Sequence, residues 1–328
     1  MRLVLARRIV LAAVTVLIVL TVTFAGLHLA PGDPVRLYLG PAADATAAET
    51  MRHQLGLDRS LPVQYARWLT HFVSGDWGTS IAAHRRVTGV LLDALGPTVL
   101  LAGASLLLTY VLGVAIGTLQ AARQRSRTDA LLTTFTTALQ SVPSYVLGLG
   151  LVLVFSYGAA LWRWPPVLRL PAIGASGIGA DFLSPGQRLL DALRHLVLPA
   201  ATLGLIGAGG LARFVRAATI EALRQPSVRT ARAKGLGERR VIARHALRTA
   251  LGPVITLAGL QLPALFSGVV FVETIFAWPG MGRVAVQSVQ ARDYPVVMAV
   301  TAVFATLVVI GNLLADAGNV WADPRQRS

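Results

Sequence analysis

The side chains in this sequence best suited to recognition chemistry are the basic ones of residues 229–253, RTARAKGLGERRVIARHALRTALGP. This stretch carries eight basic side chains, one of them a histidine, and a single glutamate. Arg240, Arg244 and Arg248 recur four residues apart, so a helix presents them as one stripe, and like charges at that spacing repel each other. The stripe therefore requires an acidic partner surface or lipid phosphates.

Two glycines divide this basic stretch into a pair of short helices. Residues 229–234 form about two helical turns, which Gly235 and Gly237 interrupt, and residues 238–248 form a second helix. The second helix has an apolar face opposite its arginines. A helix, a glycine break and a second helix can transmit motion from a partner, whereas lipid anchoring alone does not require the break.

The sequence lacks the residue patterns of a catalytic or metal site. It has no cysteine, which excludes disulfides, thiolate metal ligands and a cysteine nucleophile. The one lysine, Lys234, lies in RAKGLG, which does not fit a phosphate-binding loop. The six histidines have no metal-ligand spacing, and no G-x-S-x-G nucleophile motif is present. We therefore predict a protein that is not an enzyme, with no catalytic residues and no metal.

The composition points to a membrane protein, with 54% hydrophobic and 14% charged residues. A helix needs roughly 20 apolar residues to cross a bilayer. Six charge-poor runs qualify, namely residues 9–32, 94–122, 130–162, 195–212, 249–272 and 294–315. We therefore expect an all-α polytopic membrane protein with six transmembrane helices.

The arginines predict the orientation of these spans, because short cytoplasmic connections are rich in Lys and Arg. The formal charge of +15 is concentrated before the first span, between the second and third, between the fourth and fifth, and after the last. Residues 213–248 alone hold ten bases and two acids. Both termini and the loop 213–248 are therefore predicted to be cytoplasmic.

We expect two parts along the chain. Residues 1–93 hold the first helix and a long extracytoplasmic loop, and residues 94–328 hold a core of five helices with the cytoplasmic loop 213–248. Within the first loop, four apolar residues with helical spacing predict a short amphipathic helix that ends near Ser74 and Gly75 and lies on the rest of the protein or on the lipid interface: Tyr65, Trp68, Leu69 and Phe72.

Acidic residues near the spans test whether the protein is an ion-coupled carrier, which places acids near mid-membrane. Only Glu273 and Asp316 come close, and each lies at the end of a predicted span. Pairing with a local arginine, for example Asp316 with Arg213 or Arg216, is the simpler interpretation. A self-sufficient secondary carrier is therefore disfavoured.

Residues 229–255, RTARAKGLGERRVIARHALRTALGPVI, resemble the cytoplasmic coupling loop of permease subunits of ABC importers, in the peptide and nickel branch of the binding-protein-dependent transport family. Other segments agree in order along nearly the whole chain: APGDPV, LGLD, GDWGTS, PTVLLAGASLLL, VETIFAWPGMGR, RDYPVV and DPR. Ala231 and Gly235 match the family's coupling motif. Thr230 and Arg232 replace its glutamate and second alanine, which weakens any claim of a specific glutamate contact.

The resemblance implies that residues 228–234 form a coupling helix that docks in a groove of a separate ATPase subunit, with Val228, Ala231 and Leu236 as apolar anchors. The residues expected to couple are Val228, Thr230, Ala231, Ala233, Lys234, Gly235, Leu236, Arg240 and Arg244. ATP and magnesium would be bound by the partner subunits, and this chain would bind no cofactor. The implied partners are a second permease subunit, which completes a pseudo-symmetric heterodimer, two ATPase subunits, an extracytoplasmic binding protein and membrane lipid.

The single helix before a long outward loop resembles the first of the two permeases, in a bacterial inner membrane. The implied function is passage of peptides, with nickel or another small solute as the alternative. Glu273, Trp278 and Gly280 are expected at the outer gate of the substrate path. A membrane-anchored nucleic-acid binder is disfavoured, because the bases flank spans and no aromatic stacking platform accompanies them.

Overall fold

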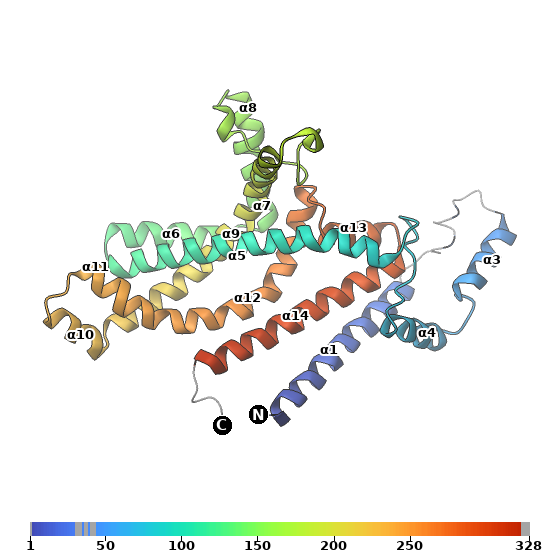
Figure 1. Cartoon of the computed structure of the whole chain (residues 1–328), viewed down its shortest axis with the longest axis horizontal. Helices are drawn as coiled ribbons and strands as arrows, with labels where there is room; N and C mark the ends of the chain where they lie inside the picture. The colour runs from blue at the N-terminus through green and yellow to red at the C-terminus, as the bar shows by residue number, and fades with distance from the viewer. Residues whose placement is uncertain (1, 30–34, 36–38, 40–43, 323–328) are drawn as a thin grey trace. The chain divides into compact units, whose positions relative to one another are not determined.

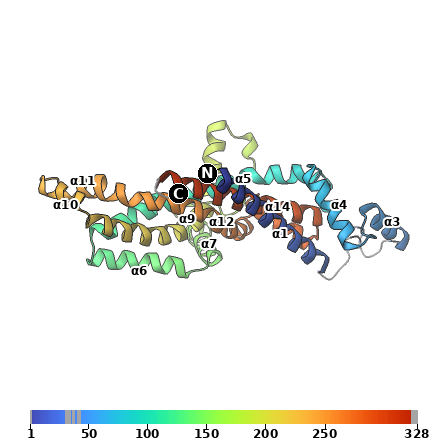
Figure 2. The same ribbon diagram turned by 90° about the horizontal axis from the view of Figure 1, so that it is seen from below.

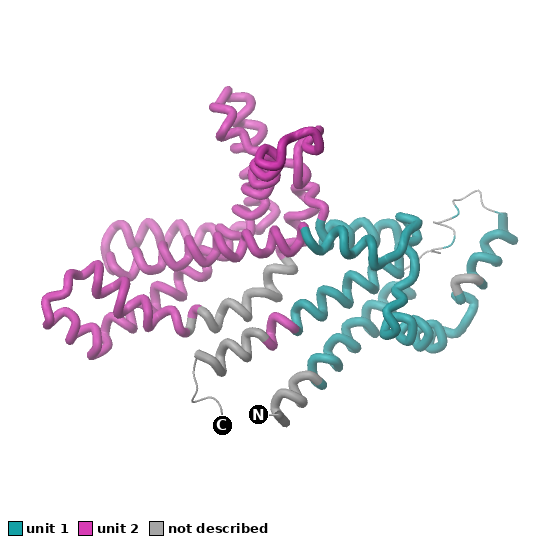
Figure 3. Tube along the Cα trace, in the orientation of Figure 1, with its two compact units in different colours: residues 1–96, 280–309 teal, residues 97–279, 310–328 magenta. Residues whose placement is uncertain are grey.

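The computed structural model describes residues 2–29, 35, 39 and 44–322, without the side chains of 2–9, 54–55, 253, 255–267 and 314–322. The regular elements of these residues are helices, apart from one β-bridge between Thr79 and Arg86. The chain forms two compact units (Figure 3). Unit 1 joins residues 1–96 to 280–309, and unit 2 holds residues 97–279 and 310–328.

The helices are distributed between the two units in chain order (Figure 1). Unit 1 contains α1 (Arg2–Leu29), α3 (Ala45–Leu55), α4 (Leu61–Val73), the start of α5 (Val87–Ala122), α13 (Met281–Gln290) and most of the described part of α14 (Tyr294–Ala322). Unit 2 contains the rest of α5, then α6 (Arg127–Ser141), α7 (Ser144–Val152), a π-helical segment (Leu153–Gly158), α8 (Ala159–Leu161), α9 (Pro185–Leu223), α10 (Pro226–Ala233), α11 (Glu238–Val241), a second π-helical segment (Ile242–Ala246) and α12 (Leu247–Ile275). Two short 3₁₀ turns, Pro166–Leu168 and Ala180–Phe182, lie between α8 and α9.

In unit 1, α1 and α14 pack against each other in antiparallel directions. Leu20 and Phe24 of α1 form a buried cluster with Met298 and Ala302 of α14. One turn further along α1, the rings of His28 and Tyr294 lie 5.7 Å apart, centroid to centroid. The C-terminal end of α1 therefore meets the N-terminal end of α14.

The amphipathic helix predicted in the first loop is confirmed as α4, which ends at Val73 with Ser74 as its C-cap. Its apolar side packs against α1: Trp68 and Phe72 join the cluster of Leu20 and Phe24. The hydroxyl groups of Tyr65 and Thr21 share a 2.7 Å hydrogen bond. The helix was expected to lie on the rest of the protein or on the lipid interface, and in the structure α4 packs on the protein.

Unit 2 is organised around α9, which has 39 residues. Helices α6, α7 and α12 all pack against it. Its middle is lined with glycine, which lets neighbouring helices approach closely, and its Leu198 and Leu203 form a core with Val269 and Phe276. At about 1.5 Å per residue, α9 is roughly 58 Å long and exceeds the thickness of a bilayer core.

Five helical segments of the described residues are long and apolar enough to cross a membrane: Val10–Leu29, Val87–Ala122, Ser144–Leu161, Pro185–Leu223 and Tyr294–Leu313. They fall on five of the six predicted spans. The remaining span, 249–272, coincides with α12, but most of its side chains lie outside the described residues.

The predicted span over residues 130–162 is not one continuous helix in the structure. Helix α6 ends at Ser141, Val142 adopts an extended conformation, and α7 begins at Ser144. Pro143 causes this break, because a proline disfavours helical geometry in the residue before it and has no N–H to continue the helical hydrogen bonds.

Candidate functional site

The loop between α9 and α12 is a compact helical hairpin, as its glycine pattern predicts. Helix α10 starts at Pro226, where a missing N–H costs nothing, and ends at Ala233. Gly235 has φ +76°, and its N–H donates to the Arg232 carbonyl at 2.9 Å, while the Leu236 N–H donates to Ala231 at 3.3 Å. This pair of bonds is a Schellman turn, which requires a residue free of strain at positive φ. In both views α10 and α11 lie side by side at one end of α9 (Figures 1 and 2).

The hairpin has a hydrophobic core of its own. Val228 is 1% and Ala231 4% exposed, and both pack against Val241, Ala246 and Ala250. In the structure Val228 and Ala231 face this core, so the expectation that they anchor in a groove of a partner stays a prediction. Their side chains are used internally to fix α10 on the following helices.

The exposed face of α10, called its outer face below, contains only some of the residues that were expected to couple to an ATPase. Of the predicted coupling residues, those exposed are Thr230, Ala233, Lys234, Gly235, Arg240 and Arg244, while Leu236 is half-buried. Sequence reasoning missed Ser227 and Arg229, which are exposed on the same short helix. Pro226 marks the true first turn of α10, and a helix counted from there places Ser227, Thr230 and Lys234 on one face.

An ion pair closes the glycine turn between α10 and α11. The Arg232 guanidinium donates two hydrogen bonds to Glu238, from Nε to Oε2 at 3.1 Å and from Nη2 to Oε1 at 2.5 Å. The hydrogen bond from Arg232 lowers the pKa of Glu238 and the same bond raises the pKa of Arg232. Both side chains remain about half exposed, so the pair orients the turn and adds little stability.

The three arginines of the predicted stripe are exposed, although the helix that carries them is irregular. Residues 242–246 form a π-helical segment, and the buried positions Val241 and Ala246 are consequently five residues apart. Among the acidic residues that the structure describes, none forms an ion pair with Arg240, Arg244 or Arg248. The stripe therefore presents free positive charge beside α10.

A half-buried ion pair joins α6 to the C-terminal half of α9. Arg216 Nε and Nη2 donate to the two carboxylate oxygens of Asp129 at 2.9 and 2.8 Å, and Asp129 also accepts from the Arg125 backbone N–H. These contacts, led by the Arg216 hydrogen bond, lower the pKa of Asp129. Ser126 caps α6 and positions this acid. The suggested pairing of Asp316 with Arg213 or Arg216 stays a prediction, because the side chain of Asp316 lies outside the described residues.

The residues expected at an outer gate are interior ones in this conformation. Glu273 is 0% exposed and accepts a 2.7 Å hydrogen bond from Thr98, and Trp278 is 1% exposed and donates to the Pro97 carbonyl at 2.9 Å. Both contacts lie in unit 2. Gly280 is buried at the start of α13, in unit 1.

Two family descriptions match this chain. The family of binding-protein-dependent transport system inner membrane components matches residues 113–328, and the N-terminal part of such membrane components matches residues 1–102. Together they cover most of the chain, including the hairpin.

Curated relatives match over nearly their full length. A putative peptide permease protein of Brucella suis is 39% identical over 318 residues, covering 96% of this chain and 94% of the relative. A glutathione transport system permease protein of Salmonella typhimurium is 38% identical over 302 residues, covering 92% and 91%. An oligopeptide transport system permease protein of Bacillus subtilis is 37% identical over 317 residues, covering 96% of each.

Solved structures share the fold at low sequence identity. A chain of the MetNI methionine ABC transporter, solved in inward-facing conformations, has a TM-score of 0.56 at 16% identity, covering 72% of this chain and 97% of the other. An amino acid ABC transporter solved with histidines has a TM-score of 0.51 at 14% identity, covering 71% and 94%. The chain therefore belongs to the family of binding-protein-dependent transport system inner membrane components, as the non-catalytic, multi-pass permease subunit of an ABC importer.

Proposed function

We propose that this chain is the first of the two permease subunits of an importer that moves peptides delivered by an extracytoplasmic binding protein. The observation that carries this proposal is the match over more than 90% of the chain to relatives named for peptide, glutathione and oligopeptide transport. A second permease subunit would complete the path, and two ATPase subunits would bind ATP and magnesium.

The proposed topology has six crossings and cytoplasmic termini. The crossings are α1, α5, the bent segment from α6 to α8, α9, α12 and α14. The antiparallel packing of α1 and α14 supports termini on one side of the membrane. The arginines of the connections favour the cytoplasmic side. Residues 1–93 would then carry the outward loop, and residues 94–328 the core.

The proposed coupling site is the outer face of α10 together with the neighbouring arginines. Thr230, Ala233 and Lys234 are exposed and would contact the ATPase, while the core around Val228 and Ala231 keeps α10 rigid on α12. Two ATPase subunits closing on ATP would draw two such hairpins together. The membrane helices would then rock as rigid bodies between inward- and outward-open states.

The proposed outer gate contains Glu273 and Trp278, with Gly280 following. Glu273 and Trp278 are buried and hydrogen-bonded to Thr98 and Pro97, and these contacts would hold the gate segment when it is closed. Opening would break both bonds. This links the gate to the start of the unit 2 part of α5.

Reconstitution tests the proposed function. The chain, its permease partner and the ATPase subunits are placed in proteoliposomes with the binding protein, and uptake of a labelled oligopeptide is followed. We expect uptake to require ATP and the binding protein and to persist when ion gradients are collapsed. Uptake driven by an ion gradient alone, or uptake of nickel instead of peptide, would contradict the proposal.

A charge reversal tests the docking face. Arg244→Glu is expected to reduce co-purification of the ATPase, because the stripe would then repel an acidic partner surface. Arg85→Glu is the matched control, since Arg85 is also exposed but pairs locally with Asp93. Equal ATPase recovery from both variants would argue against a docking role for the stripe.

A further inference from the structure

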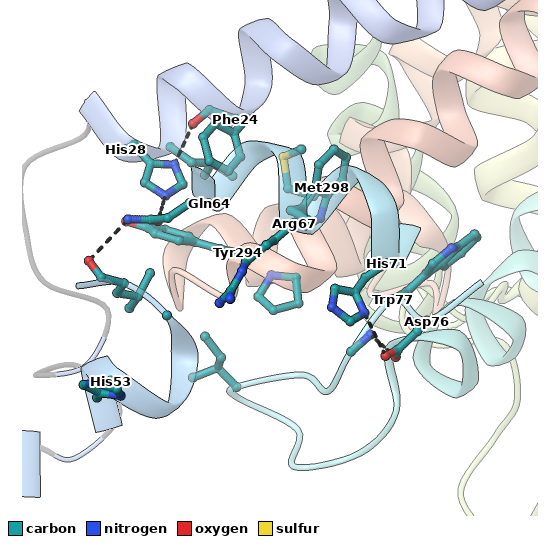
Figure 4. A pocket seen from close by; sticks show the side chains of 17 residues that line it. Phe24, His28, His53, Gln64, Arg67, His71, Asp76, Trp77, Tyr294 and Met298 are labelled. Atoms are coloured by element: carbon teal, nitrogen blue, oxygen red, sulfur yellow. Dashed lines mark hydrogen bonds and ion pairs between the residues drawn. The ribbon is translucent and has the colours of Figure 1, made fainter. Parts of the chain in front are cut away.

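Unit 1 contains a cavity of about 440 Å³ that the proposed coupling mechanism does not use. It is open on one side and is lined by the end of α1, the end of α3 and the turn after it, α4, the loop after α4 and the first turn of α14 (Figure 4). Helix α4 contributes four lining residues at i, i+3, i+4 and i+7: Gln64, Arg67, Trp68 and His71. The volume lies in the range of small-molecule sites, which hold a drug-sized ligand in roughly 300–1,000 Å³.

Most polar groups of the cavity wall already have partners within the protein. The ring nitrogens of His28 contact the Phe24 carbonyl at 2.8 Å and Gln64 Oε1 at 3.1 Å. The Gln64 amide nitrogen donates to the carbonyls of Leu57 and Arg59. The wall at this end is therefore preorganised and offers no strong hydrogen-bonding group to a ligand.

At the opposite end of the cavity, Asp76 is surrounded by local polar groups. His71 Nδ1 lies 3.5 Å from Asp76 Oδ2, and the other Asp76 oxygen accepts from the Gly78 N–H at 3.2 Å. The indole N–H of Trp77 donates to the Phe72 carbonyl. The acid of the cavity is thus occupied by local donors.

Arg67 is the exception. Its guanidinium points into the cavity between Tyr294 and His71 (Figure 4), beside the tight turn at Gly56. None of the acidic residues that the structure describes forms an ion pair with it. A permanent cation that faces a cavity and pairs with none of the described acids is a binding position for an anionic group.

The rest of the wall is apolar and aromatic. Trp68 stacks on Phe72 with centroids 5.1 Å apart, and Phe72 stacks on Trp77 at the same separation. Met298 and Pro295 close the cavity from α14. A single arginine beside aromatic rings fits a carboxylate that carries an apolar side chain, whereas a phosphate dianion would favour more than one cationic group.

We propose that this cavity binds the free carboxylate end of a short peptide, with Arg67 holding the carboxylate and the aromatic wall holding the last side chain. This inference rests on the proposed peptide function, and it adds a peptide site outside the membrane path. In the proposed topology the C-terminal end of α1 and the N-terminal end of α14 face outward. The site therefore lies on the side of the membrane from which the binding protein would deliver peptide.

Direct binding tests the proposal on the complete transporter in lipid nanodiscs, without the binding protein. Ligand-observed NMR measures the affinity of the dipeptide Ala-Phe, of Ala-Phe amide and of inorganic phosphate. We expect Ala-Phe to bind, and amidation or Arg67→Gln to weaken it at least ~10-fold, since each removes one partner of the ion pair. Arg67→Lys should retain part of the affinity, because it keeps the charge.

Arg59→Gln is the matched control, because Arg59 is an exposed arginine of the same unit that does not line the cavity. It should leave the affinity for Ala-Phe unchanged. Equal binding by wild type and Arg67→Gln would overturn the inference. So would displacement of Ala-Phe by phosphate at matched concentration.

The uptake assay separates this inference from the proposed function. ATP-driven peptide uptake by a wild-type transporter that binds no Ala-Phe at this cavity overturns the inference alone. Absence of any ATP-driven peptide uptake overturns the proposed function instead.

Discussion

The hairpin between α9 and α12 and the contact between α5 and α9 both depend on glycine, for opposite reasons. Gly235 has open space around it, but its φ of +76° suits a residue without a Cβ. Gly117 lies within regular helix, yet a Cβ there would meet the Ala212 carbonyl at 2.4 Å and Val215 at 2.7 Å. The first glycine sets a direction of the chain, and the second sets a distance between helices.

The two glycines are therefore expected to matter for different properties: Gly235 for the direction of α10, and Gly117 for the stability of the fold. The hairpin has an exposed outer face, so a change at its turn is expected to alter the direction of α10 and to disturb only the core around Val228. The contact between α5 and α9 lies in the interior of unit 2, where side chains are close-packed. Substitutions in the two regions should therefore affect different measurements.

The largest effect on folding is expected for Gly117→Val. Overpacking costs about 3 kcal/mol or more where backbone must move, because the Ala212 carbonyl cannot yield like a flexible side chain. Size-exclusion chromatography after heating should show a large loss of folded transporter. Gly103→Val, in the same helix with nothing near its Cβ position, is the control. Equal stability of the two variants would refute the close contact.

A smaller loss is expected for Arg216→Gln, which leaves the buried Asp129 without its cation. We expect about 1–3 kcal/mol. Arg213→Gln is the control, since Arg213 is exposed and bonded to Gln140. The result is read from the same heating assay.

The pH dependence of this pair has a defined sign. Because the folded pKa of Asp129 is lowered, the ion pair stabilises fully above the ordinary carboxyl pKa of about 4 and is lost as pH falls through the folded value. The difference between wild type and Arg216→Gln should therefore be constant from pH 5 to 8 and shrink in acid. A difference that changes near pH 7 would point to another group.

For Gly235→Val the comparison predicts a modest stability cost, about 1–2 kcal/mol, and a large functional one. A residue with a branched Cβ must leave positive φ, so α10 would turn away from its docking direction. Uptake should fall while basal ATP hydrolysis persists, or the ATPase should fail to dock. Gly237→Val is the control, since Gly237 has φ −60° and equally open space. Normal uptake by Gly235→Val would contradict the interpretation that the hairpin transmits motion from a partner.

The smallest effect is expected for Arg232→Gln, because its pair with Glu238 is half exposed and such pairs contribute under about 1 kcal/mol. Arg229→Gln, an exposed arginine of the same helix, serves as control. Hydrogen exchange at the Gly235 turn should detect faster opening only in Arg232→Gln. A loss of stability as large as that of Arg216→Gln would contradict the distinction between surface and buried pairs.

The sequence was sufficient for features that depend on local chemistry. Gly235 marked the turn of the hairpin, and the spacing of Tyr65, Trp68 and Phe72 marked α4 and its apolar side. Charge-free runs located five segments that the structure shows as long apolar helices. Each of these follows from hydropathy, helical period or the freedom of a glycine.

Other features depend on contacts between distant residues, and a single sequence does not contain them. The burial of Val228 depends on Val241 and Ala250, and a π-helical segment supplies the register that brings them together. The partner of Arg216 is 87 residues away in the chain. Pro143 indicates a helix break from local sequence alone, but hydropathy over residues 130–162 does not register a proline.

Because of the π-helical segment at Ile242–Ala246, the direction in which α10 points depends on the number of residues in this segment. An α-helix advances by about 100° per residue, so one residue added or removed turns everything before it by that angle relative to α12. The single extra residue of the π-helical segment therefore fixes the rotation of α10 about the axis of α12. In relatives, insertion or deletion of one residue here would re-aim α10 without altering any side chain on its face.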